Sequence, residues 1–361
     1  MYNPAKPYND LPILPPKVEI ETKAVLKLAI EANKALAELN FATKMLPDPT
    51  VLINTIPLQE AKASSEIENI VTTSDELFRA SFTDNTDVDS ATKETLRYRQ
   101  ALKAGCEMLT AKPITTNMIC EICSIIKNTE MNIRKVSGTQ IKNVATGEVL
   151  YTPPEGEKVI RDLLSNWERF LNENADFDPL VKMAVLHYQF EAIHPFLDGN
   201  GRTGRILNML YLMQEGLLAY PVLYLSGYII NNKADYYRLI RGVTAGENWQ
   251  DWIIYILQGI REASLETVQR IESISALMKQ TYEDIKRFAP NVPAKEMNDL
   301  IFTQPYCRVK NIVDAGIAKR QTAMVYLKNL EDAGILESVK AGREVLFVNR
   351  KFLKYLSISG Q

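Results

Sequence analysis

Apolar residues recur along most of this chain at the three- and four-residue intervals of an α-helix, and this period limits the fold more than any other feature. Ala24, Leu28 and Ala32 follow it near the start. Residues 180–193 follow it again further along, until Pro195 prevents an easy continuation. The sequence therefore predicts a mainly α-helical protein.

Two parts of the chain depart from the helical period. Glycines separate short runs that contain several β-forming residues, and these runs predict a small hairpin between Thr139 and Tyr151. Near the C-terminus, three helical stretches precede two strand-like runs, 336–340 and 344–348, with a turn at 341–343. This order is typical of a winged helix, a relative of the helix-turn-helix.

Length and turn-forming residues indicate more than one domain. A chain of 361 residues exceeds the usual domain size of about 100 to 200 residues. Turn chemistry interrupts the first helical part at 46–49 and 84–87, and the stretch 288–293 reads as a linker with two prolines. We expect an N-terminal helical domain, a central core and a C-terminal winged helix, with the bounds 1–112, 113–287 and 288–361.

Composition excludes several classes of protein. A net charge of -2 gives no global attraction to nucleic acids or anionic membranes. The N-terminus lacks the regions of a signal peptide, and no stretch approaches the roughly 20 apolar residues of a membrane-spanning helix. Four cysteines are too few for a disulfide framework in a chain of this length, which favours a reducing cytoplasm. Cys120 and Cys123 fall in an apolar helical run and are interpreted as core residues.

The stretch from His194 to Arg205 predicts an anion site. Glycine lets backbone N–H groups approach phosphate oxygens closely, and the start of a helix adds a positive dipole. Gly199 and Gly201 lie at such a start. Arg202 and Arg205, three residues apart, project from nearly the same helix face and can both hold phosphate oxygens.

Two further side chains of this stretch offer functions that nucleotide chemistry needs. Asp198 is a candidate ligand for Mg²⁺, which often takes one or two protein carboxylates. His194 is a candidate general base, because its ordinary pKa lies near neutral pH. The stretch is also compatible with a plain helix–helix turn. A dinucleotide-binding loop would need a preceding strand, and a calcium loop would need more oxygen ligands.

The same stretch resembles the signature of the Fic family, H-x-F-x-[D/E]-G-N-G-R-x-x-R. Every fixed position is matched, by His194, Phe196, Asp198, Gly199, Asn200, Gly201, Arg202 and Arg205. The resemblance implies a Fic-type helical core with a β-hairpin flap. It also implies transfer of the AMP unit of ATP to a Ser, Thr or Tyr hydroxyl of a target protein, with release of pyrophosphate.

The resemblance implies a role for each residue of this loop. His194 would be the general base and Asp198 would hold Mg²⁺. The backbone of Gly199–Gly201 would cradle phosphate, and Arg202 and Arg205 would hold the β- and γ-phosphates. The nucleotide-binding residues implied are Gly199, Asn200, Gly201, Arg202, Thr203, Gly204 and Arg205. The stretch 231–237 resembles the one that closes over adenine in the family, which makes Tyr236 a candidate adenine contact, and a core position for this tyrosine stays open.

A second match lies upstream, where Ser64, Glu68 and Asn69 resemble the family's inhibitory pattern [S/T]-x-x-x-E-[G/N]. Ser64 and Glu68 are one helical turn apart and share a face. By the resemblance, Glu68 pairs with Arg205 and displaces the γ-phosphate, so the inhibitory helix belongs to the N-terminal domain. The hairpin at 139–151 resembles the family's flap, which aligns the target by main-chain pairing.

The C-terminal module carries a modest positive charge. Between Lys295 and Gln361, eleven Lys and Arg residues face seven Asp and Glu residues, a local balance of +4. Lys319 and Arg320 would open the recognition helix, where contacts to DNA are usually made. DNA binding and protein contact both stay open for this module.

Taken with the resemblance, these features predict a cytoplasmic protein adenylyltransferase that uses ATP and Mg²⁺ and is inhibited by its own helix. The acceptor is a target protein or the chain itself, no membrane partner is expected, and a homodimer stays open. Two alternatives remain. One is a DNA-binding regulator whose core senses nucleotide, and the other is a deAMPylase in which Glu68 orients a water that removes AMP from a modified protein.

Overall fold

The computed structural model describes residues 2–46, 48–82, 88–142, 146–173, 176–341 and 344–357. The turn expected at 84–87 lies outside the described residues. The same holds for Pro47, for residues 143–145 of the expected hairpin, and for residues 342 and 343 of the expected C-terminal turn.

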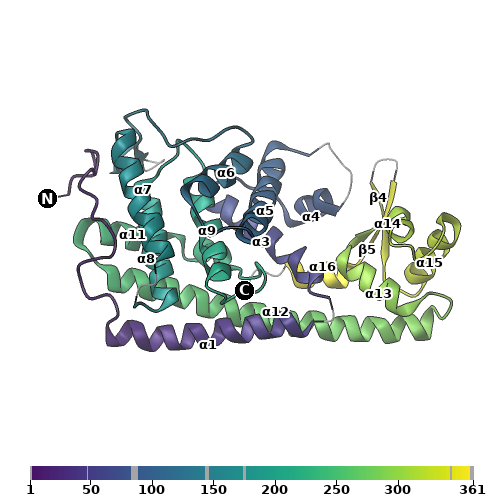
Figure 1. Ribbon diagram of the computed structural model, residues 1–361. Coiled ribbons are helices and arrows are strands. Elements are labelled where there is room, and N and C mark those ends of the chain that lie inside the picture. Colours follow the sequence, from purple (N-terminus) through teal and green to yellow (C-terminus); the bar gives the residue numbers. More distant parts are fainter. Residues whose placement is uncertain are drawn as a thin grey trace.

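The fold is mainly α-helical, as predicted (Figure 1). The helices of the N-terminal and central parts are α1 (Lys23–Met45), α2 (Thr50–Ile53), α3 (Ile56–Ile67), α4 (Ser74–Phe82), α5 (Ser90–Leu109), α6 (Thr116–Lys127), α7 (Glu157–Asn172), α8 (Pro179–Ile193), α9 (Asn200–Gln214), α10 (Leu225–Asn231), α11 (Lys233–Gly246) and α12 (Trp249–Phe288). The C-terminal module adds α13 (Ala294–Thr303), α14 (Val309–Asp314), α15 (Arg320–Asp332) and α16 (Arg350–Ser357). Within the described ranges, none of the helices combines the length and the apolar character that crossing a membrane would take.

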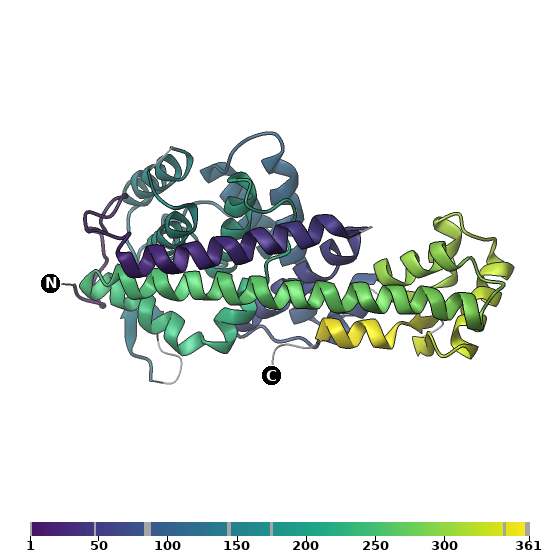
Figure 2. The same ribbon diagram turned by 90° about the horizontal axis from the view of Figure 1, so that it is seen from below.

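The helix α12 runs along one side of the molecule and connects its parts (Figure 2). Its 40 residues span about 60 Å at 1.5 Å per residue. The helix α1 packs along its first half, and α13 and the rest of the C-terminal module follow its far end. Ile253, Ile256 and Ile260 keep the helical period and are fully buried. The helix expected from about Trp249 to Lys286 is therefore confirmed.

The helix α8 lies at the centre of the core, with α7, α9, α12 and α1 packed against it. Asp178 caps its start by accepting two backbone N–H groups. Because neighbours surround the helix, apolar residues cover nearly all of its sides. Trp167 and Trp252 donate from Nε1 to carbonyl oxygens of α8 at 2.9 and 2.8 Å. These contacts fix the helix that leads into the loop at His194.

The two small sheets lie where the sequence predicts them. The strands β1 (Ile141–Lys142) and β2 (Val149–Tyr151) pair antiparallel and form the expected hairpin. The C-terminal module contains β3 (Tyr306–Cys307), β4 (Glu337–Ala341) and β5 (Glu344–Val348) in the order β3-β5-β4. With α13, α14 and α15 they form the predicted winged helix. The elements β3 and α16 were not predicted, because such short elements give little periodic signal.

Candidate active site

The chain forms a braced loop between α8 and α9. His194 ends α8 in the left-handed conformation, with φ of 49°, and Gly199 makes a second such turn before α9, with φ of 83°. Between them, the side-chain amide of Asn200 accepts the Phe196 N–H and donates to the Phe196 carbonyl, both at 2.8 Å. Arg134 donates from Nε to the carbonyl of His194 at 2.8 Å. The loop is thus held from inside and from a neighbouring segment.

The imidazole of His194 is neutral at pH 7. Burial lowers its pKa to about 4, and the Arg134 guanidinium acts in the same direction. Within the described residues, its buried Nδ1 atom has no hydrogen-bond partner. A neutral imidazole can take up a proton, which is the state that a general base needs.

Arg205 is bound by the upstream helix α3. Its Nη2 atom donates to Glu68 Oε1 at 2.9 Å and to the Ser64 carbonyl at 2.8 Å, and its Nε atom donates to Ser64 Oγ at 2.7 Å. Burial alone would lower the pKa of Arg205, but the Glu68 carboxylate raises it above its ordinary value. Asn69, with φ of 62°, turns the chain just after Glu68. The structure therefore brings Ser64 and Glu68 to the loop, and Asn69 shapes the turn behind them.

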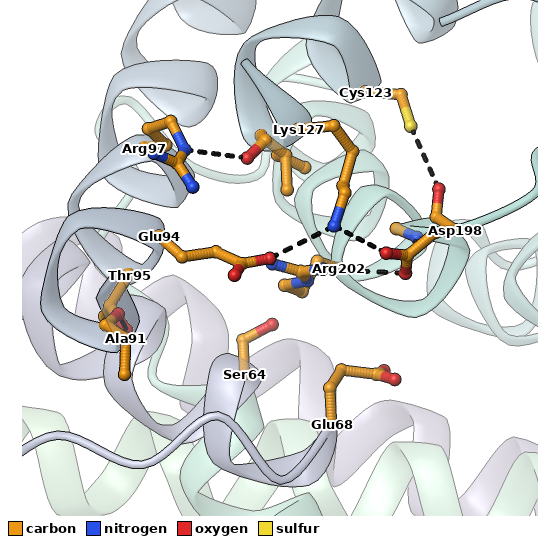
Figure 3. Close-up of polar contacts among 12 residues, drawn as sticks. Ser64, Glu68, Ala91, Glu94, Thr95, Arg97, Cys123, Lys127, Asp198 and Arg202 are labelled. Atoms are coloured by element: carbon orange, nitrogen blue, oxygen red, sulfur yellow. Dashed lines mark hydrogen bonds and ion pairs between the residues drawn. The ribbon is translucent and has the colours of Figure 1, made fainter. Parts of the chain in front are cut away.

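Arg202 and Asp198 also have charged partners (Figure 3). Arg202 donates from Nη1 to Glu94 Oε1 on α5 at 2.6 Å, and Asp198 Oδ2 lies 2.5 Å from Nζ of Lys127 at the end of α6. Glu94 and Lys127 were not predicted as site residues. Neither residue belongs to a motif. Arg202 is buried and needs a counter-ion, but the sequence does not show which distant acid supplies it.

The loop offers one carboxylate to a cation. Asp198 keeps 63% of its side chain exposed. Among the described residues, no group of three His, Cys, Asp or Glu side chains converges as a protein-only metal cage would require. A single exposed carboxylate fits Mg²⁺, which keeps several waters and binds phosphate oxygens. The residues present therefore fit a magnesium ion that binds together with a nucleotide.

The two tyrosines of α11 differ in their surroundings. Tyr236 is buried, with its hydroxyl 2.9 Å from Nε2 of His187 and its ring against Trp252. Tyr237 keeps 38% of its surface exposed. Burial and the nearby Glu68 carboxylate raise the pKa of Tyr237 to about 12. Contact between Tyr236 and adenine stays a prediction, and Tyr237 becomes a second candidate because its ring is partly exposed.

The hairpin is attached to the end of α8. Tyr151 on β2 donates from its hydroxyl to the carbonyl of Ala192, two residues before His194, at 2.7 Å. The rings of Tyr2 and Tyr8, in the proline-rich N-terminal arm, pack on Tyr151 from the other side. The sequence predicted the hairpin but not these anchors, which join segments far apart in the chain.

Three family models match consecutive parts of the chain. The model of the Fic/DOC family N-terminal region matches residues 26–107, and that of the Fic/DOC family matches residues 113–212. The C-terminal domain of protein adenylyltransferase SoFic-like proteins matches residues 277–352. The three matches follow one another without overlap and include both α3 and the loop.

Several named proteins resemble part of the chain. Protein adenylyltransferase fic-1 of Caenorhabditis briggsae is 29% identical over 148 residues, which are 40% of this chain and 26% of that protein. The fic-1 protein of Caenorhabditis elegans is 33% identical over 101 residues, or 27% and 18% of the two chains. A probable protein adenylyltransferase of Aquifex aeolicus is 40% identical over 68 residues, or 19% and 21%. The chain thus matches about a quarter or less of each relative's length.

Solved structures share the fold. A Fic family protein from Desulfovibrio desulfuricans G20 superposes with a TM-score of 0.61 at 18% identity, over 92% of this chain and 98% of that chain. Fic-1 of C. elegans superposes with a TM-score of 0.52 at 19% identity, over 72% and 76%. The first likeness extends over the N-terminal, central and C-terminal parts alike.

Proposed function

Because the chain belongs to the Fic/DOC family, we propose that it is a protein adenylyltransferase that transfers AMP from ATP to a Ser, Thr or Tyr hydroxyl of a target protein. The joint position of His194, Arg202 and Arg205 on one braced loop supports this activity most directly. The loop combines a neutral base, two guanidiniums and the positive end of a helix. These three features together can bind a triphosphate and take a proton from an attacking hydroxyl.

The position of these groups supports the following reaction. The target hydroxyl attacks the α-phosphorus of ATP, a new P–O bond forms, and the bond to the bridging β-phosphate oxygen breaks to release pyrophosphate. Neutral His194 takes the hydroxyl proton. The backbone N–H groups of Gly199–Gly201 and the guanidiniums of Arg202 and Arg205 bind the phosphates. Asp198 would hold Mg²⁺, which would supply further neutralisation of phosphate charge.

The conformation described here corresponds to the inhibited state of this proposed enzyme. Glu68 and Ser64 occupy all three hydrogen bonds recorded for Arg205. Glu68 Oε1 also fills the space directly above Gly201, where a phosphate would approach the helix start. Productive binding of ATP therefore requires the Glu68 carboxylate to leave Arg205.

We assign a different task to each part of the chain. Residues 1–112 regulate the site through α3, and residues 113–287 hold the catalytic loop. The hairpin at 139–151 serves as the flap that aligns the target segment, which its anchor at the end of α8 supports. Residues 288–361 recruit a partner through the winged helix.

The test is a labelling experiment with ATP that carries the label on its α-phosphate. The purified protein is incubated with Mg²⁺ and a cell extract, as wild type, Glu68→Gly and the double variant Glu68→Gly/His194→Ala. Glu66→Gly serves as the matched control, because it removes a carboxylate of the same helix that pairs with Lys62 instead of Arg205.

We expect protein labelling to rise in Glu68→Gly, to stay at the wild-type level in Glu66→Gly, and to vanish in the double variant. Equal labelling with and without the His194 imidazole would remove this residue from the mechanism. Absence of labelling from every variant would contradict the proposed activity.

A further inference from the structure

A second charged cluster lies apart from Glu68 (Figure 3). It joins Arg202 and Asp198 of the loop to Glu94 and Lys127 of the neighbouring helices. Arg202 Nη1 lies 2.6 Å from Glu94 Oε1, and Lys127 Nζ lies 3.3 Å from the same oxygen and 2.5 Å from Asp198 Oδ2. Arg202 Nη2 lies 3.8 Å from Asp198 Oδ1, so two cations and two anions alternate in a closed set with no net charge.

The fold holds Lys127 in this place. Arg97 donates from Nε to the carbonyl of Ile126 at 3.1 Å, which ties α5 to the last turn of α6. The side chain of Lys127 is 22% exposed. Its Cδ and Cγ atoms lie 3.4 and 3.5 Å from the position that a Cβ on Gly199 would take. Lys127 is therefore packed over the loop by its stem, unlike a lysine that extends into solvent.

The Asp198 carboxylate has a partner on each of its oxygens. Lys127 Nζ lies 2.5 Å from Oδ2, and the backbone N–H of Gly199 donates to Oδ1 at 2.6 Å. Asp198 thus already has a cation on the oxygen that would otherwise be open to a metal ion.

We propose that Lys127 is a positioning residue that occupies the Asp198 carboxylate until Mg²⁺ and ATP bind, and so sets the magnesium concentration that nucleotide binding requires. This inference rests on the function proposed above. The Lys127 ammonium lies 2.5 Å from Asp198 Oδ2 and would repel a divalent cation bound to the same carboxylate. The ammonium must therefore move away when the cation binds. Glu94, already 3.3 Å from Lys127 Nζ, is its remaining partner.

Substitution of Lys127 should change the magnesium dependence of ATP binding in a defined direction. Lys127→Gln removes the competing charge and retains a polar side chain of similar reach, so Asp198 should accept Mg²⁺ more readily. Lys127→Arg keeps the charge and should keep the competition. If Lys127 had a purely structural role, its loss would weaken ATP binding at every magnesium concentration.

The experiment measures ATP binding by calorimetry at a series of Mg²⁺ concentrations and in EDTA. All proteins carry Glu68→Gly and His194→Ala, so that Arg205 is open and no turnover occurs. The variants compared on this background are Lys127→Gln, Lys127→Arg and the control Lys103→Gln, whose lysine pairs with Glu107 on the exposed face of α5. Thermal melting checks that each variant is folded.

We expect the Mg²⁺ concentration at half-maximal ATP affinity to fall by about three- to tenfold in Lys127→Gln, the effect of one ion pair. It should stay unchanged in Lys127→Arg and Lys103→Gln. ATP binding with an unchanged or higher midpoint in folded Lys127→Gln would overturn this inference and leave the proposed function intact. Failure of every variant to bind ATP would overturn both.

Discussion

Glu68 Oε1 lies 2.9 Å from Nη2 of Arg205, across a separation of 137 positions in the chain. The contact joins the end of α3 to the second turn of α9, so the N-terminal part of the chain touches Arg205 directly. Ser64 reinforces it with two further hydrogen bonds to the same guanidinium. Release of Arg205 therefore requires α3 to shift or the Glu68 side chain to rotate.

Removal of the Ser64 hydroxyl should relieve inhibition in part. Ser64→Ala deletes the acceptor of the Arg205 Nε bond and leaves the Glu68 ion pair in place. The loss of one charge-assisted hydrogen bond, about 1.5 to 3 kcal/mol, should loosen the Glu68 contact without abolishing it. We expect AMP transfer between the rates of wild type and Glu68→Gly, measured with α-labelled ATP. A rate equal to that of Glu68→Gly would show that the ion pair alone does not inhibit.

A methyl group on Gly201 should block the phosphate site. The added Cβ would overlap Glu68 Oε1 and would lie 3.0 Å from Nη1 of Arg205. In a Glu68→Gly background the overlap with Glu68 Oε1 disappears. The added methyl group still occupies the space at the N-terminus of α9 where a phosphate would bind. Gly201→Ala should therefore weaken ATP binding by about tenfold or more in calorimetry. Gly246→Ala, where a Cβ meets open space, is the control and should bind as the parent does.

The buried histidines should make stability depend on pH. Burial lowers the pKa of His194 to about 4 and that of His187 to about 3, from 6.5 in the unfolded chain. The folded protein binds fewer protons than the unfolded chain below pH 6.5. Stability is therefore complete above that pH and falls as the pH drops toward 4. His194 alone contributes about 3 kcal/mol over this range.

Thermal melts at pH 7.5, 6 and 5 measure this effect. The melting temperature of wild type should fall with pH, and the fall should be smaller in His194→Gln, which cannot take up the proton. Parallel pH dependence in the two proteins would show that His194 is not kept neutral by the fold.

Motifs predicted the candidate loop and the contact between Glu68 and Arg205, because each motif is a short run of specified residue types. The sequence also predicted the central helix, the hairpin and the winged helix, because each contains runs of residues that show a helical or strand pattern. Glu94, Lys127 and Arg134 were missed. Their contribution comes from tertiary packing, which brings three unremarkable charged side chains against the loop.

The contacts of the two adjacent tyrosines were hidden, although their exposure was not. Tyr236 lies three and seven residues before Leu239 and Val243, so the helical period places it on the buried face of α11. The structure buries Tyr236 against Trp252 and leaves Tyr237 partly exposed. The local sequence could not show that His187 and Trp252 would be the neighbours of Tyr236.

The winged helix should bind DNA if it acts as a recognition module for nucleic acid. Lys319 caps α15 and Arg320 opens it. Removal of both charges by alanine substitution should lower the affinity for DNA and reduce its salt slope by about 2. Fluorescence anisotropy with duplex DNA between low and moderate salt tests this, with Lys103→Ala/Lys112→Ala as control. Absence of binding at low salt would leave protein contact as the role of this module.

The most direct test of the central claim compares two positions of the label in ATP. Glu68→Gly protein is incubated with Mg²⁺ and a cell extract, either with α-labelled or with γ-labelled ATP. Protein-bound label is counted after subtraction of the label found with Glu68→Gly/His194→Ala, which removes the contribution of kinases in the extract. The account predicts label on protein from the α-phosphate alone, with the γ-label recovered in pyrophosphate. Protein labelling from the γ-phosphate, or from neither position, would contradict transfer of AMP.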